Sequence, residues 1–558
     1  MITITEKLTK KVPGITSVFV EFDYNPKVVE SIKTLPCYNF SKRTKEWEIP
    51  IVYLSQLIDV LCVYDDIELK LCQVNFPEPI VHDLKVDYKT KPFDYQMEGI
   101  QFGLNHDKWL LLDPPGLGKT LQMICLAEEL RQREGIEHCL VICGINTLKT
   151  NWKKEIEKHS NLSCRILGEK VNSRGKISYG SIEDRLAQLK SPIKEFFVIT
   201  NIETLRNDKI IKAILKGKNK FDMIVVDEVH KCKSSTSQQG KNLLKLTSAK
   251  YKVAATGTLL LNNPLDTYVP LKWVDADRST EGNFNRYYSV YGGQFGHDFM
   301  GYRNLDTLKK QLELYSLRRQ KSLLNLPPKN IITEYVDMSD AQKSFYENIK
   351  NGVIEEVDKV TLKPNVVLGM AMRLRQATAC PSILSSKPIP SAKMDRVCDL
   401  CEEITSTGNK VVVFSTFKET VKELFPRLQE YNPLVGTGDI PDEEISSNID
   451  KFQNDDKYKV FIGTWQKCGT GLTLTKASHM IFLDTPYTHA AFEQACDRIY
   501  RIGTTKPVFI YNLVVTDTID ERVKEIVEDK AALSDFIIDD IITQKSLNLL
   551  QKYIEELR

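Results

Sequence analysis

The amino-acid sequence predicts an α/β protein in which two lobes, each built on a parallel β-sheet, follow a small α+β module. Short apolar runs alternate with polar, helix-compatible stretches, and this alternation is typical of parallel sheets whose faces are covered by helices. It begins near residue 88, breaks off between about residues 262 and 390, and then resumes. One α/β lobe, an insertion and a second α/β lobe are therefore expected, since 558 residues are too many for a single core.

Residues 1–86 are expected to form the separate N-terminal module. The stretch SVFVEFDY alternates like a strand, and KEWEIPI has the same character. One short amphipathic helix is expected to begin at Pro26, and a second is expected in YLSQLIDVL. Trp47 is interpreted as a core residue of the module in preference to a ligand-contacting one.

Lobe one is expected over residues 87–262 and lobe two over residues 393–530. The strand candidates of lobe one are WLLLD, CLVICG, FFVIT, MIVVDE and YKVAATG, and those of lobe two are KVVVFSTF, YKVFIGT, MIFLD and VFIYNLV. Residues 263–392 are aromatic-rich and then helical, which indicates a helical insertion and a bridge between the lobes. Residues 531–558 are expected to form a helical tail.

Composition and charge restrict the partners. The net charge of +2 and the pI of about 7.8 do not indicate a chain that binds nucleic acid through its overall charge, so such binding would use local grooves. The N-terminus lacks a signal-peptide core, and no apolar run approaches the roughly 20 residues that span a bilayer, so no membrane partner is expected. The 13 cysteines, an odd number, favour reduced thiols in a cytosolic compartment. Cys398 and Cys401 lack the further ligands of a zinc site and are interpreted as two cysteines on a helix.

The segment DPPGLGKT, which follows the strand candidate WLLL, has the pattern of a phosphate-binding loop. A glycine-rich turn lets backbone N–H groups approach phosphate oxygens, and the helix that follows adds its dipole. Lys119 could then reach the β- and γ-phosphates, and the Thr120 hydroxyl could bind Mg²⁺. The pattern usually begins with glycine, where this chain has Asp113. A strand-to-helix turn with a chance lysine is the simpler alternative.

Two further segments carry chemistry in the expected sheets. MIVVDEVH places Asp227 and Glu228 at the end of a buried strand, where Asp227 could hold Mg²⁺ and Glu228 could polarise a water molecule. QACDRIYRIG places Arg498 and Arg501 three residues apart, hence on one face of an expected helix, and arginines are suited to neutralising charge on a transferring phosphoryl group. Taken singly, these could be an ordinary strand end and a solvated basic helix face.

An ordered series of segments between about residues 88 and 523 resembles the superfamily-two helicases, specifically the Swi/Snf-type DNA translocases. The segments are FDYQMEGI, DPPGLGKT, LKTNWKKE, ITNIETLR, DEVHKCKSSTSQQGK, ATGTLLLN, LRRQKSLLNLPPK, LRQATACPSIL, VVVFSTF, IGTWQKCGTGLTL and QACDRIYRIG. In this family the first residue of the phosphate-binding loop is typically Asp, as at Asp113. The sequence departs from the family at Leu259, where proline is usual, and at Thr504, where glutamine is usual.

The resemblance implies two RecA-like lobes, the cofactors ATP and Mg²⁺, and a role for each matched residue. The implied catalytic residues are Lys119, Asp227, Glu228, Arg498 and Arg501, with Thr120 and Asp227 holding the metal. The implied ATP-binding residues are Gln96, which would recognise adenine, Pro115, Gly116, Leu117, Gly118, Lys119, Thr120 and Gln494. The implied nucleic-acid contacts are Lys149, Asn151, Lys233, Thr416 and Thr464, and the implied coupling residues are Thr256, Gly257, Gly469 and Gly471.

The resemblance also implies an activity. Such a motor would track along double-stranded DNA with DNA-stimulated ATP hydrolysis and would contact mostly phosphates, so it would carry little sequence specificity. YNPKVVESIKTLP and TKEWEIPI resemble the HARP-like module found beside the motor in annealing helicases, which implies strand annealing or branch migration on forked or branched DNA.

Three alternatives remain beside this hypothesis. The same motor could remove DNA-bound proteins. An RNA helicase is disfavoured because VH follows the acidic pair, where DEAD-box proteins have AD. A non-catalytic DNA-binding scaffold is disfavoured because all five implied catalytic residues are present. Lys-, Ile- and Asn-rich usage favours a bacterial or phage source, hence a cytoplasmic protein, or a nuclear one if the source is eukaryotic. A monomer is expected.

Overall fold

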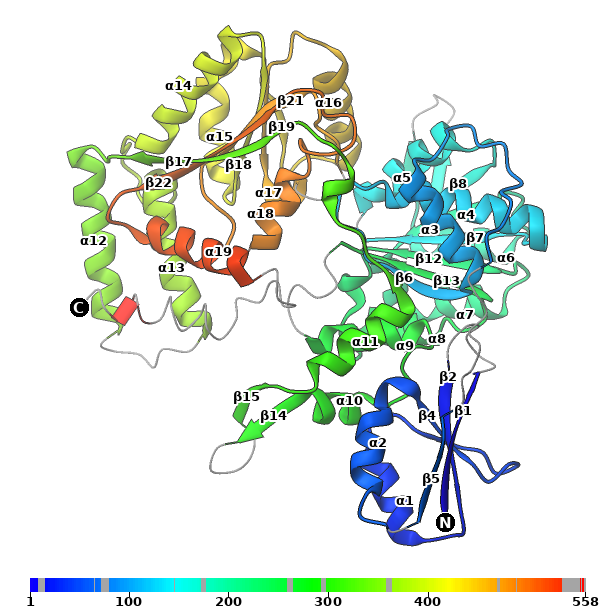
Figure 1. The fold of residues 1–558 in the computed structure, drawn as a ribbon. Helices are drawn as coiled ribbons and strands as arrows, with labels where there is room; N and C mark the ends of the chain where they lie inside the picture. The colour runs from blue at the N-terminus through cyan, green and yellow to red at the C-terminus, as the bar shows by residue number, and fades with distance from the viewer. Residues whose placement is uncertain are drawn as a thin grey trace. The chain divides into compact units, whose positions relative to one another are not determined.

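A computed structural model describes residues 1–8, 16–64, 66–71, 80–144, 146–171, 177–257, 264–292, 298–357, 364–468, 472–487, 489–533, 552, 554 and 555 (Figure 1). The chain divides into two compact units. The first contains Met1–Pro114, Gly118–Leu259 and Pro264–Gln320, and the second contains Lys321–Arg558 together with Pro115–Leu117.

The N-terminal module is a five-stranded sheet with helices packed on one face (Figure 1). Its elements are β1 (Ile2–Leu8), β2 (Thr16–Phe22), α1 (Pro26–Lys33), β3 (Asn39–Phe40), β4 (Trp47–Pro50), α2 (Leu54–Leu61) and β5 (Ile67–Lys70), with the strand order β3-β4-β2-β1-β5. Alternate residues of the strands pack against the apolar faces of α1 and α2 because successive side chains point to opposite sides of a sheet. Trp47 is 8% exposed and belongs to this core, as expected.

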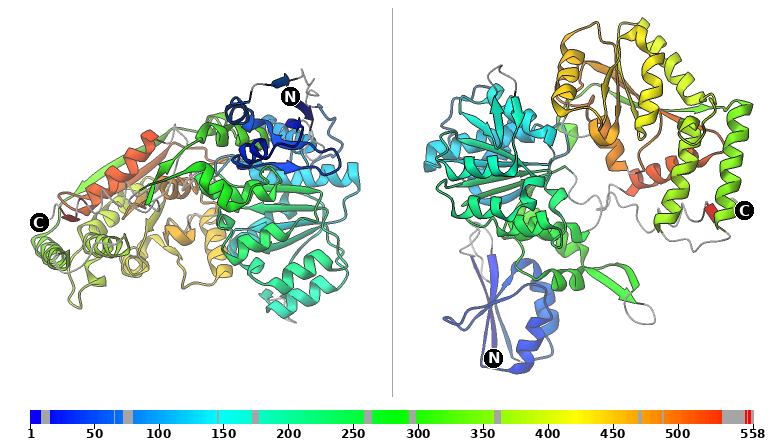
Figure 2. Two further views of the ribbon diagram at one scale, coloured as in Figure 1. Left: turned by 90° about the horizontal axis from the view of Figure 1, so that it is seen from below. Right: turned by 180° about the vertical axis from the view of Figure 1, so that it is seen from behind.

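Lobe one is a seven-stranded sheet in which every pairing is parallel. In spatial order the strands are β16 (Ser316–Leu317), β6 (Lys108–Leu111), β13 (Tyr251–Ala255), β12 (Met223–Asp227), β7 (Cys139–Cys143), β11 (Phe197–Asn201) and β8 (Cys164–Ile166). The covering helices are α3 (Asp94–Asn105), α4 (Lys119–Glu134), α5 (Asn146–His159), α6 (Ile182–Lys190), α7 (Asp208–Lys216) and α8 (Gln238–Lys245), which lie on both faces (Figures 1 and 2). The five expected strands are present, and the short edge strands β8 and β16 were not anticipated.

The segment after lobe one's central strands packs onto the N-terminal module. It contains α9 (Tyr268–Trp273), α10 (Glu281–Tyr288), the antiparallel hairpin β14 (Ser289–Gly292) and β15 (Asp298–Tyr302), and α11 (Leu305–Tyr315). The hydroxyls of Tyr53 and Tyr288 lie 3.2 Å apart, and Arg278 pairs with Glu48 at 2.9 Å. The module is therefore fastened to the insertion by buried side chains and not only by the connecting chain.

Lobe two is a six-stranded sheet, again with only parallel pairings. In spatial order the strands are β17 (Lys329–Val336), β22 (Val508–Val515), β21 (Ala477–Phe482), β18 (Lys410–Ser415), β20 (Val460–Thr464) and β19 (Leu434–Gly436). Its helices are α14 (Ala392–Ser406), α15 (Lys418–Arg427), α16 (Asp442–Asn454), α17 (Trp465–Cys468), α18 (His489–Cys496) and α19 (Ile519–Leu533), with α12 (Asp340–Val357) and α13 (Pro364–Ala379) packed against α19. The strand β17 lies in the stretch expected as insertion and bridge, yet it pairs with β22 along eight residues.

The structure confirms the predicted fold class: an α/β protein with two parallel-sheet lobes and a small α+β module. Cys398 and Cys401 both lie on α14, as expected. Within the residues that the structure describes, every helix is too short or too polar to cross a bilayer.

Candidate nucleotide site and nucleic-acid contacts

The phosphate-binding loop connects β6 to α4 through two glycines in the left-handed region. Gly116 has φ of +92° and Gly118 has φ of +72°, conformations that side chains with a Cβ rarely adopt. Gly118 is the N-cap of α4 and offers no side chain to the first turn of that helix. The N–H groups of that turn can thus donate to phosphate oxygens, so the loop fits the phosphates of ATP.

Lys119 and Thr120 begin α4, beside this loop. Lys119 Nζ donates to the carbonyl oxygen of Asp113 at 2.8 Å and to that of Pro114 at 3.4 Å. The ammonium is thereby held across the loop, over the backbone that a phosphate would approach. Pro115 is half-buried, as are Lys119 and Thr120, whereas Leu117 is buried.

Asp113, the residue that departs from the usual glycine, is fully buried and ion-paired with Arg319. Its Oδ1 accepts from the backbone N and from Nε of Arg319, both at 3.1 Å, and its Oδ2 accepts from Arg319 Nη2 and from Gln122 Nε2. Arg319 Nη2 also donates to Gln122 Oε1 at 2.6 Å. Asp113 therefore locks the start of the loop to a strand-like segment 206 residues further along the chain. The segment LRRQKSLLNLPPK belongs to the ordered series of motifs, but no local pattern predicts that its Arg319 pairs with Asp113.

Asp227 and Glu228 stand at the carboxyl end of β12, as expected. Asp227 Oδ2 accepts from Trp152 Nε1 at 3.0 Å, and burial together with the charge of Glu228 raises the pKa of Asp227. Burial alone would raise the pKa of Glu228 as well, but the hydrogen bond from His230 and the charges of His230 and Lys119 hold it below its usual range. Glu228 therefore stays ionised in neutral solution, as a group that polarises water must.

Glu228 has an unusual backbone, with φ of +56° in the left-handed region. Gly144, at the end of the neighbouring strand β7, makes room for it: a Cβ at Gly144 would lie 2.7 Å from Glu228 Cβ. Strain of this kind persists where surrounding structure enforces it and is common at functional sites.

Thr256, an implied coupling residue, lies at the end of β13, between β6 and β12. Its backbone N donates to Leu111 O at 3.0 Å, and its hydroxyl lies 3.4 Å from Glu228 Oε2 and 3.0 Å from His230 Nδ1. Thr256 thus joins the loop-bearing strand to the Glu228 carboxylate, and His230, which the sequence did not single out, completes the group. Gly257 follows Thr256, while Leu259, Gly469 and Gly471 lie outside the described residues.

Gln96 lies on α3 and is 1% exposed. Its Oε1 accepts from the backbone N of Phe93 at 3.0 Å, so in the structure its carbonyl caps α3. Adenine recognition by Gln96 stays a prediction.

In lobe two, Arg498 and Arg501 follow α18 and do not share a helical face, which corrects the expectation. The helix ends at Cys496, and the arginines lie in the turns beyond it. Within these turns the Thr504 hydroxyl accepts from Arg501 N at 3.1 Å and donates to Ile499 O at 2.7 Å. The two guanidinium groups nevertheless converge, because Nη1 of each lies within 3.4 Å of the Leu472 carbonyl oxygen. Arg498 Nε also donates to the carbonyl of Gln494 at 3.0 Å.

The segment that carries these arginines is anchored by the start of the second unit. Lys321 pairs with Asp497 and lies 4.8 Å from the centre of the Tyr500 ring. Lys329 pairs with Glu493 at 2.8 Å. The residues just after Arg319 therefore hold the arginine segment, whereas Arg319 itself holds the phosphate-binding loop.

Of the implied nucleic-acid contacts in lobe one, Lys149 is not placed for the role. Its side chain is 1% exposed, so in this structure it does not present its ammonium to solvent. Asn151 is half-buried on α5, and Lys233 pairs with Asp266 at 2.7 Å while remaining 40% exposed. The apolar spacing of α5 turns one lysine of LKTNWKKE inward, which the motif alone does not reveal.

In lobe two, Thr416 and Thr464 follow or end neighbouring strands, β18 and β20. Thr416 N donates to Asp484 Oδ1 at 2.8 Å, and its hydroxyl accepts from Trp465 Nε1 at 3.1 Å. Thr464 is 7% exposed. The structure thus brings the two threonines to one edge of the sheet and links them through Trp465, a residue that the sequence did not single out.

The residues present fit the implied Mg²⁺. Mg²⁺ needs only one or two protein oxygen ligands when a substrate phosphate supplies others. Thr120 follows the glycine-rich loop, and Asp227 offers a carboxylate with a raised pKa, which a bound cation would lower. Among the described residues, no group of three or more His, Cys, Asp or Glu side chains could hold a metal by itself.

Comparison with protein families matches residues 95–383 to the SNF2-related domain and residues 392–503 to the helicase conserved C-terminal domain. An uncharacterized ATP-dependent helicase of Mycoplasma pneumoniae is 26% identical over 509 residues, 88% of this chain and 47% of the relative. The ATP-dependent helicase FUN30 of Saccharomyces cerevisiae is 24% identical over 560 residues, 83% of this chain and 48% of the relative. The chain spans about half the length of these curated relatives.

Among solved structures, the Sulfolobus solfataricus SWI2/SNF2 ATPase core in complex with dsDNA is 24% identical. The match covers 86% of this chain and 98% of that chain, with a TM-score of 0.37.

Proposed function

The chain belongs to the SNF2-related family, and on this basis we propose that it is a DNA-dependent ATPase that translocates along double-stranded DNA. One observation carries the proposal: the carboxyl edge of the lobe-one sheet brings together the phosphate-binding loop, the acidic pair and the residue between them. The loop that leads to Lys119 follows β6, Thr256 follows β13, and Glu228 follows β12, and these three strands are neighbours in the sheet. This arrangement has the parts that phosphoryl transfer to water requires.

Each of these lobe-one residues would have its own role in ATP hydrolysis. The backbone N–H groups of the loop and Lys119 would bind the phosphates, with the Lys119 ammonium exchanging the carbonyl oxygens of Asp113 and Pro114 for phosphate oxygens. Glu228, held ionised beside His230, would orient and polarise the attacking water. Thr120 and Asp227 would hold Mg²⁺, which offsets phosphate charge when bound. Through its contacts with Glu228 and with Leu111, Thr256 would link the position of the Glu228 side chain to β6, the strand that leads into the loop.

Arg498 and Arg501 are the proposed charge-neutralising residues of lobe two. Their convergence on the Leu472 carbonyl shows that both guanidinium groups can reach one small region. An arginine that meets the phosphates only in one state of the motor would couple hydrolysis to movement. Gln494 is proposed as part of the same nucleotide contact.

We assign the DNA contacts to Asn151 and Lys233 in lobe one and to Thr416 and Thr464 in lobe two. These are polar groups suited to phosphates, and Lys233 would exchange Asp266 for a DNA phosphate. Contacts of this kind position a duplex without reading its sequence, as a translocating motor needs.

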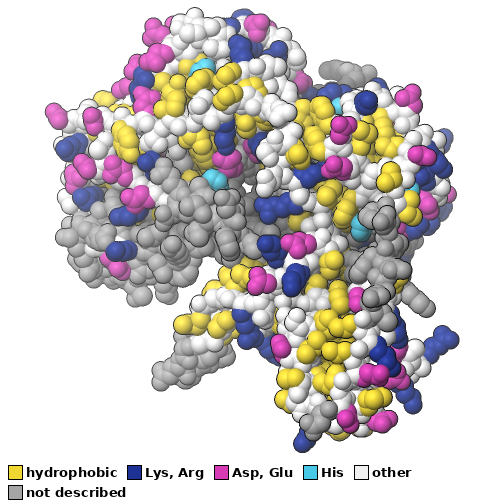
Figure 3. Space-filling view, in the orientation of Figure 1, with side chains coloured by type: hydrophobic (Ala, Val, Ile, Leu, Met, Phe, Trp, Pro, Cys, Tyr) yellow, Lys and Arg dark blue, Asp and Glu magenta, His cyan; other side chains and the backbone are white. Residues whose placement is uncertain are grey.

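The finer proposal is that the motor remodels forked or branched DNA, with the N-terminal module contacting the DNA structure. The turn between β3 and β4 carries Lys42, Arg43 and Lys45, all exposed. The turn is held by Ser41, whose backbone pairs with Glu46 at 3.0 Å and with Lys45 at 2.8 Å. Lys and Arg side chains, interspersed with acidic ones, project from the module in Figure 3. A fixed basic turn on a module fastened to the motor is suited to holding a second DNA arm.

The test is the steady-state ATPase rate with single-stranded, duplex, forked and four-way DNA and with RNA. Stimulation by duplex DNA over RNA is the expected result, and failure of every DNA to stimulate hydrolysis would overturn the assignment. Forked DNA should stimulate more than plain duplex. Equal stimulation by the two would instead favour a motor that removes DNA-bound proteins.

A variant with Lys42→Ser, Arg43→Ser and Lys45→Asn isolates the module. Asn is chosen at position 45 because Lys45 has φ of +58°, which Asn tolerates. This variant should lose the preference for forked DNA and keep the stimulation by duplex. Lys27→Ala with Lys33→Ala, on the exposed side of α1, is the control and should keep both.

A further inference from the structure

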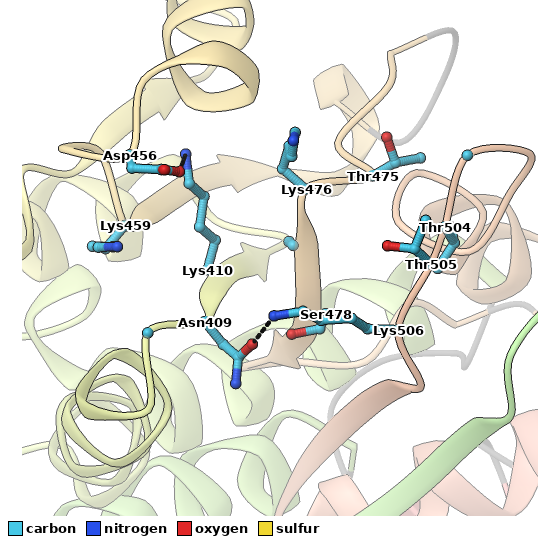
Figure 4. Close-up of a pocket in the computed structure, with 13 residues that line it drawn as sticks. Asn409, Lys410, Asp456, Lys459, Thr475, Lys476, Ser478, Thr504, Thr505 and Lys506 are labelled. Carbon is cyan, nitrogen blue, oxygen red and sulfur yellow. Dashed lines mark hydrogen bonds and ion pairs between the residues drawn. The ribbon is translucent and has the colours of Figure 1, made fainter.

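A cavity of about 380 Å³ opens at the amino ends of the lobe-two strands (Figure 4). Its walls come from the starts of β18 and β21, from the residues before β20 and from the loop before β22. Among the described residues that line it are four lysines, Lys410, Lys459, Lys476 and Lys506, and a single carboxylate, Asp456.

The positive charge of this cavity is only partly compensated. Lys410 already has partners within the protein and is not counted as a ligand-binding group. Its buried Nζ donates to Phe452 O at 2.6 Å and to Asp455 O at 2.8 Å, and it lies 3.6 Å from Asp456. Within the described part of the chain, no carboxylate pairs with the ammonium of Lys459, Lys476 or Lys506. Three lysines without an ion-pair partner among the described residues therefore line one concave space against the single carboxylate of Asp456, an excess of positive charge that favours binding of an anion.

The cavity also offers hydrogen-bond donors at fixed positions. Lys506 Nζ is held at the wall by Asn409 Oδ1, 3.0 Å away, as Figure 4 shows. Ser478, 6% exposed, lies on the same wall, with its hydroxyl 2.9 Å from His479 Nδ1. Several donors around a small polar space match a phosphate group, whose oxygens accept several hydrogen bonds, better than a carboxylate.

This cavity is distinct from the contacts assigned above. Thr416 and Thr464 lie at the carboxyl ends of β18 and β20, whereas the cavity lies at the amino ends of the same sheet. A strand rises about 3.3 Å per residue, so the length of β18 separates the two edges by roughly 17 Å.

The cavity wall continues into the arginine segment. Thr504 lines the cavity, and its hydroxyl accepts from the backbone N of Arg501 at 3.1 Å. Thr475 lines it two residues after Thr473, whose hydroxyl accepts from Arg501 Nη1 at 3.0 Å. An occupant of the cavity would thus touch both chain segments that position Arg501.

We propose that this cavity is a binding site for a phosphate group, held by Lys459, Lys476 and Lys506. The phosphate could belong to the backbone of a DNA arm or to a small free phosphate compound, since the binding chemistry is the same. The site does not take part in ATP hydrolysis, so its failure would leave the proposed function unaffected.

The test uses the full chain with Lys119→Ala, which weakens phosphate binding at the loop. Inorganic pyrophosphate is titrated calorimetrically into this chain, into the same chain with Lys476→Ala and Lys506→Ala, and into one with Lys343→Ala and Lys387→Ala as the control. The control lysines are exposed on the same unit, away from the cavity. Pyrophosphate should bind, with an affinity about tenfold lower after the cavity substitutions and unchanged in the control.

The affinity for duplex DNA, measured at several salt concentrations, distinguishes a phosphate of the DNA backbone from that of a small compound. If the phosphate belongs to DNA, the cavity substitutions also weaken duplex binding, with a salt slope smaller by about 0.9 for each lost phosphate contact. If it belongs to a small compound, only pyrophosphate binding falls. The proposal is overturned if the cavity substitutions change neither pyrophosphate nor duplex binding.

Discussion

Arg319 holds the first residue of the phosphate-binding loop, Asp113, in a buried ion pair, although 206 residues separate them. Two residues further on, Lys321 pairs with Asp497 beside the arginine segment of lobe two. One short stretch of chain therefore fastens both sets of implied catalytic residues, and each attachment lies within its own unit.

The Arg319–Asp113 pair should be required for stability and for ATP binding. Replacing Arg319 with Gln leaves the buried Asp113 charge without its partner, a change that typically costs about 3–5 kcal/mol. We expect a comparable loss of unfolding free energy and a raised KM for ATP. The measurements are chemical unfolding and ATPase kinetics.

Arg318→Gln is the matched control, because Arg318 is exposed next to Arg319. Combining Arg319→Gln with Asp113→Asn should recover part of the lost stability, since no unpaired charge is then buried. If the double variant is as unstable as the sum of the single ones, the pair does not have the proposed coupling.

Glu228→Gln should lower kcat by about 10²–10⁴ and leave ATP binding close to its original value. The amide keeps the shape of the side chain but cannot polarise water, whereas the loop proposed to bind the phosphates is unchanged. Single-turnover hydrolysis and fluorescent-nucleotide binding measure the two effects separately. An unchanged kcat would remove Glu228 from its proposed role.

Gly144→Ala should lower kcat more than it raises the KM for ATP. The added Cβ would meet Glu228 Cβ at 2.7 Å and push that residue from its left-handed backbone conformation. Gly282→Ala is the control, since a Cβ there meets no atom within 4 Å. Equal kinetics for both variants would mean that the site accommodates the displacement.

Lys252 should give lobe one a pH-dependent stability. Its side chain is 1% exposed, and burial lowers the pKa of Lys252 to about 8, below the roughly 10.4 of a free lysine. Between these two values the unfolded chain binds more protons than the folded one, so the free energy of unfolding rises with pH.

Lys252→Met should flatten this slope and raise the free energy of unfolding at pH 7 by up to about 3 kcal/mol. The free energy of unfolding is measured by tryptophan fluorescence during urea unfolding at pH 7 to 10, roughly the window set by the two pKa values. The signal reports mainly on the first unit, which holds Trp47, Trp109, Trp152 and Trp273. The same slope in both proteins would assign it to another group.

The elements that the sequence determined by itself are those with a local signal. Apolar runs followed by helix-compatible stretches located the central strands of both lobes, because burial on both faces of a parallel sheet selects continuous apolar segments. The loop from Asp113 to Thr120 and the pair Asp227 and Glu228 also have a local signal, because their chemistry requires adjacent residues in one order.

The tertiary structure decided whatever depends on residues distant in the chain. It paired Asp113 with Arg319, turned Lys149 into the core, and ended α18 at Cys496 before the two arginines. It also gathered Lys459, Lys476 and Lys506 from three separate segments around one cavity. Burial and ion pairing depend on which elements pack together, and helix spacing or a local motif does not contain that information.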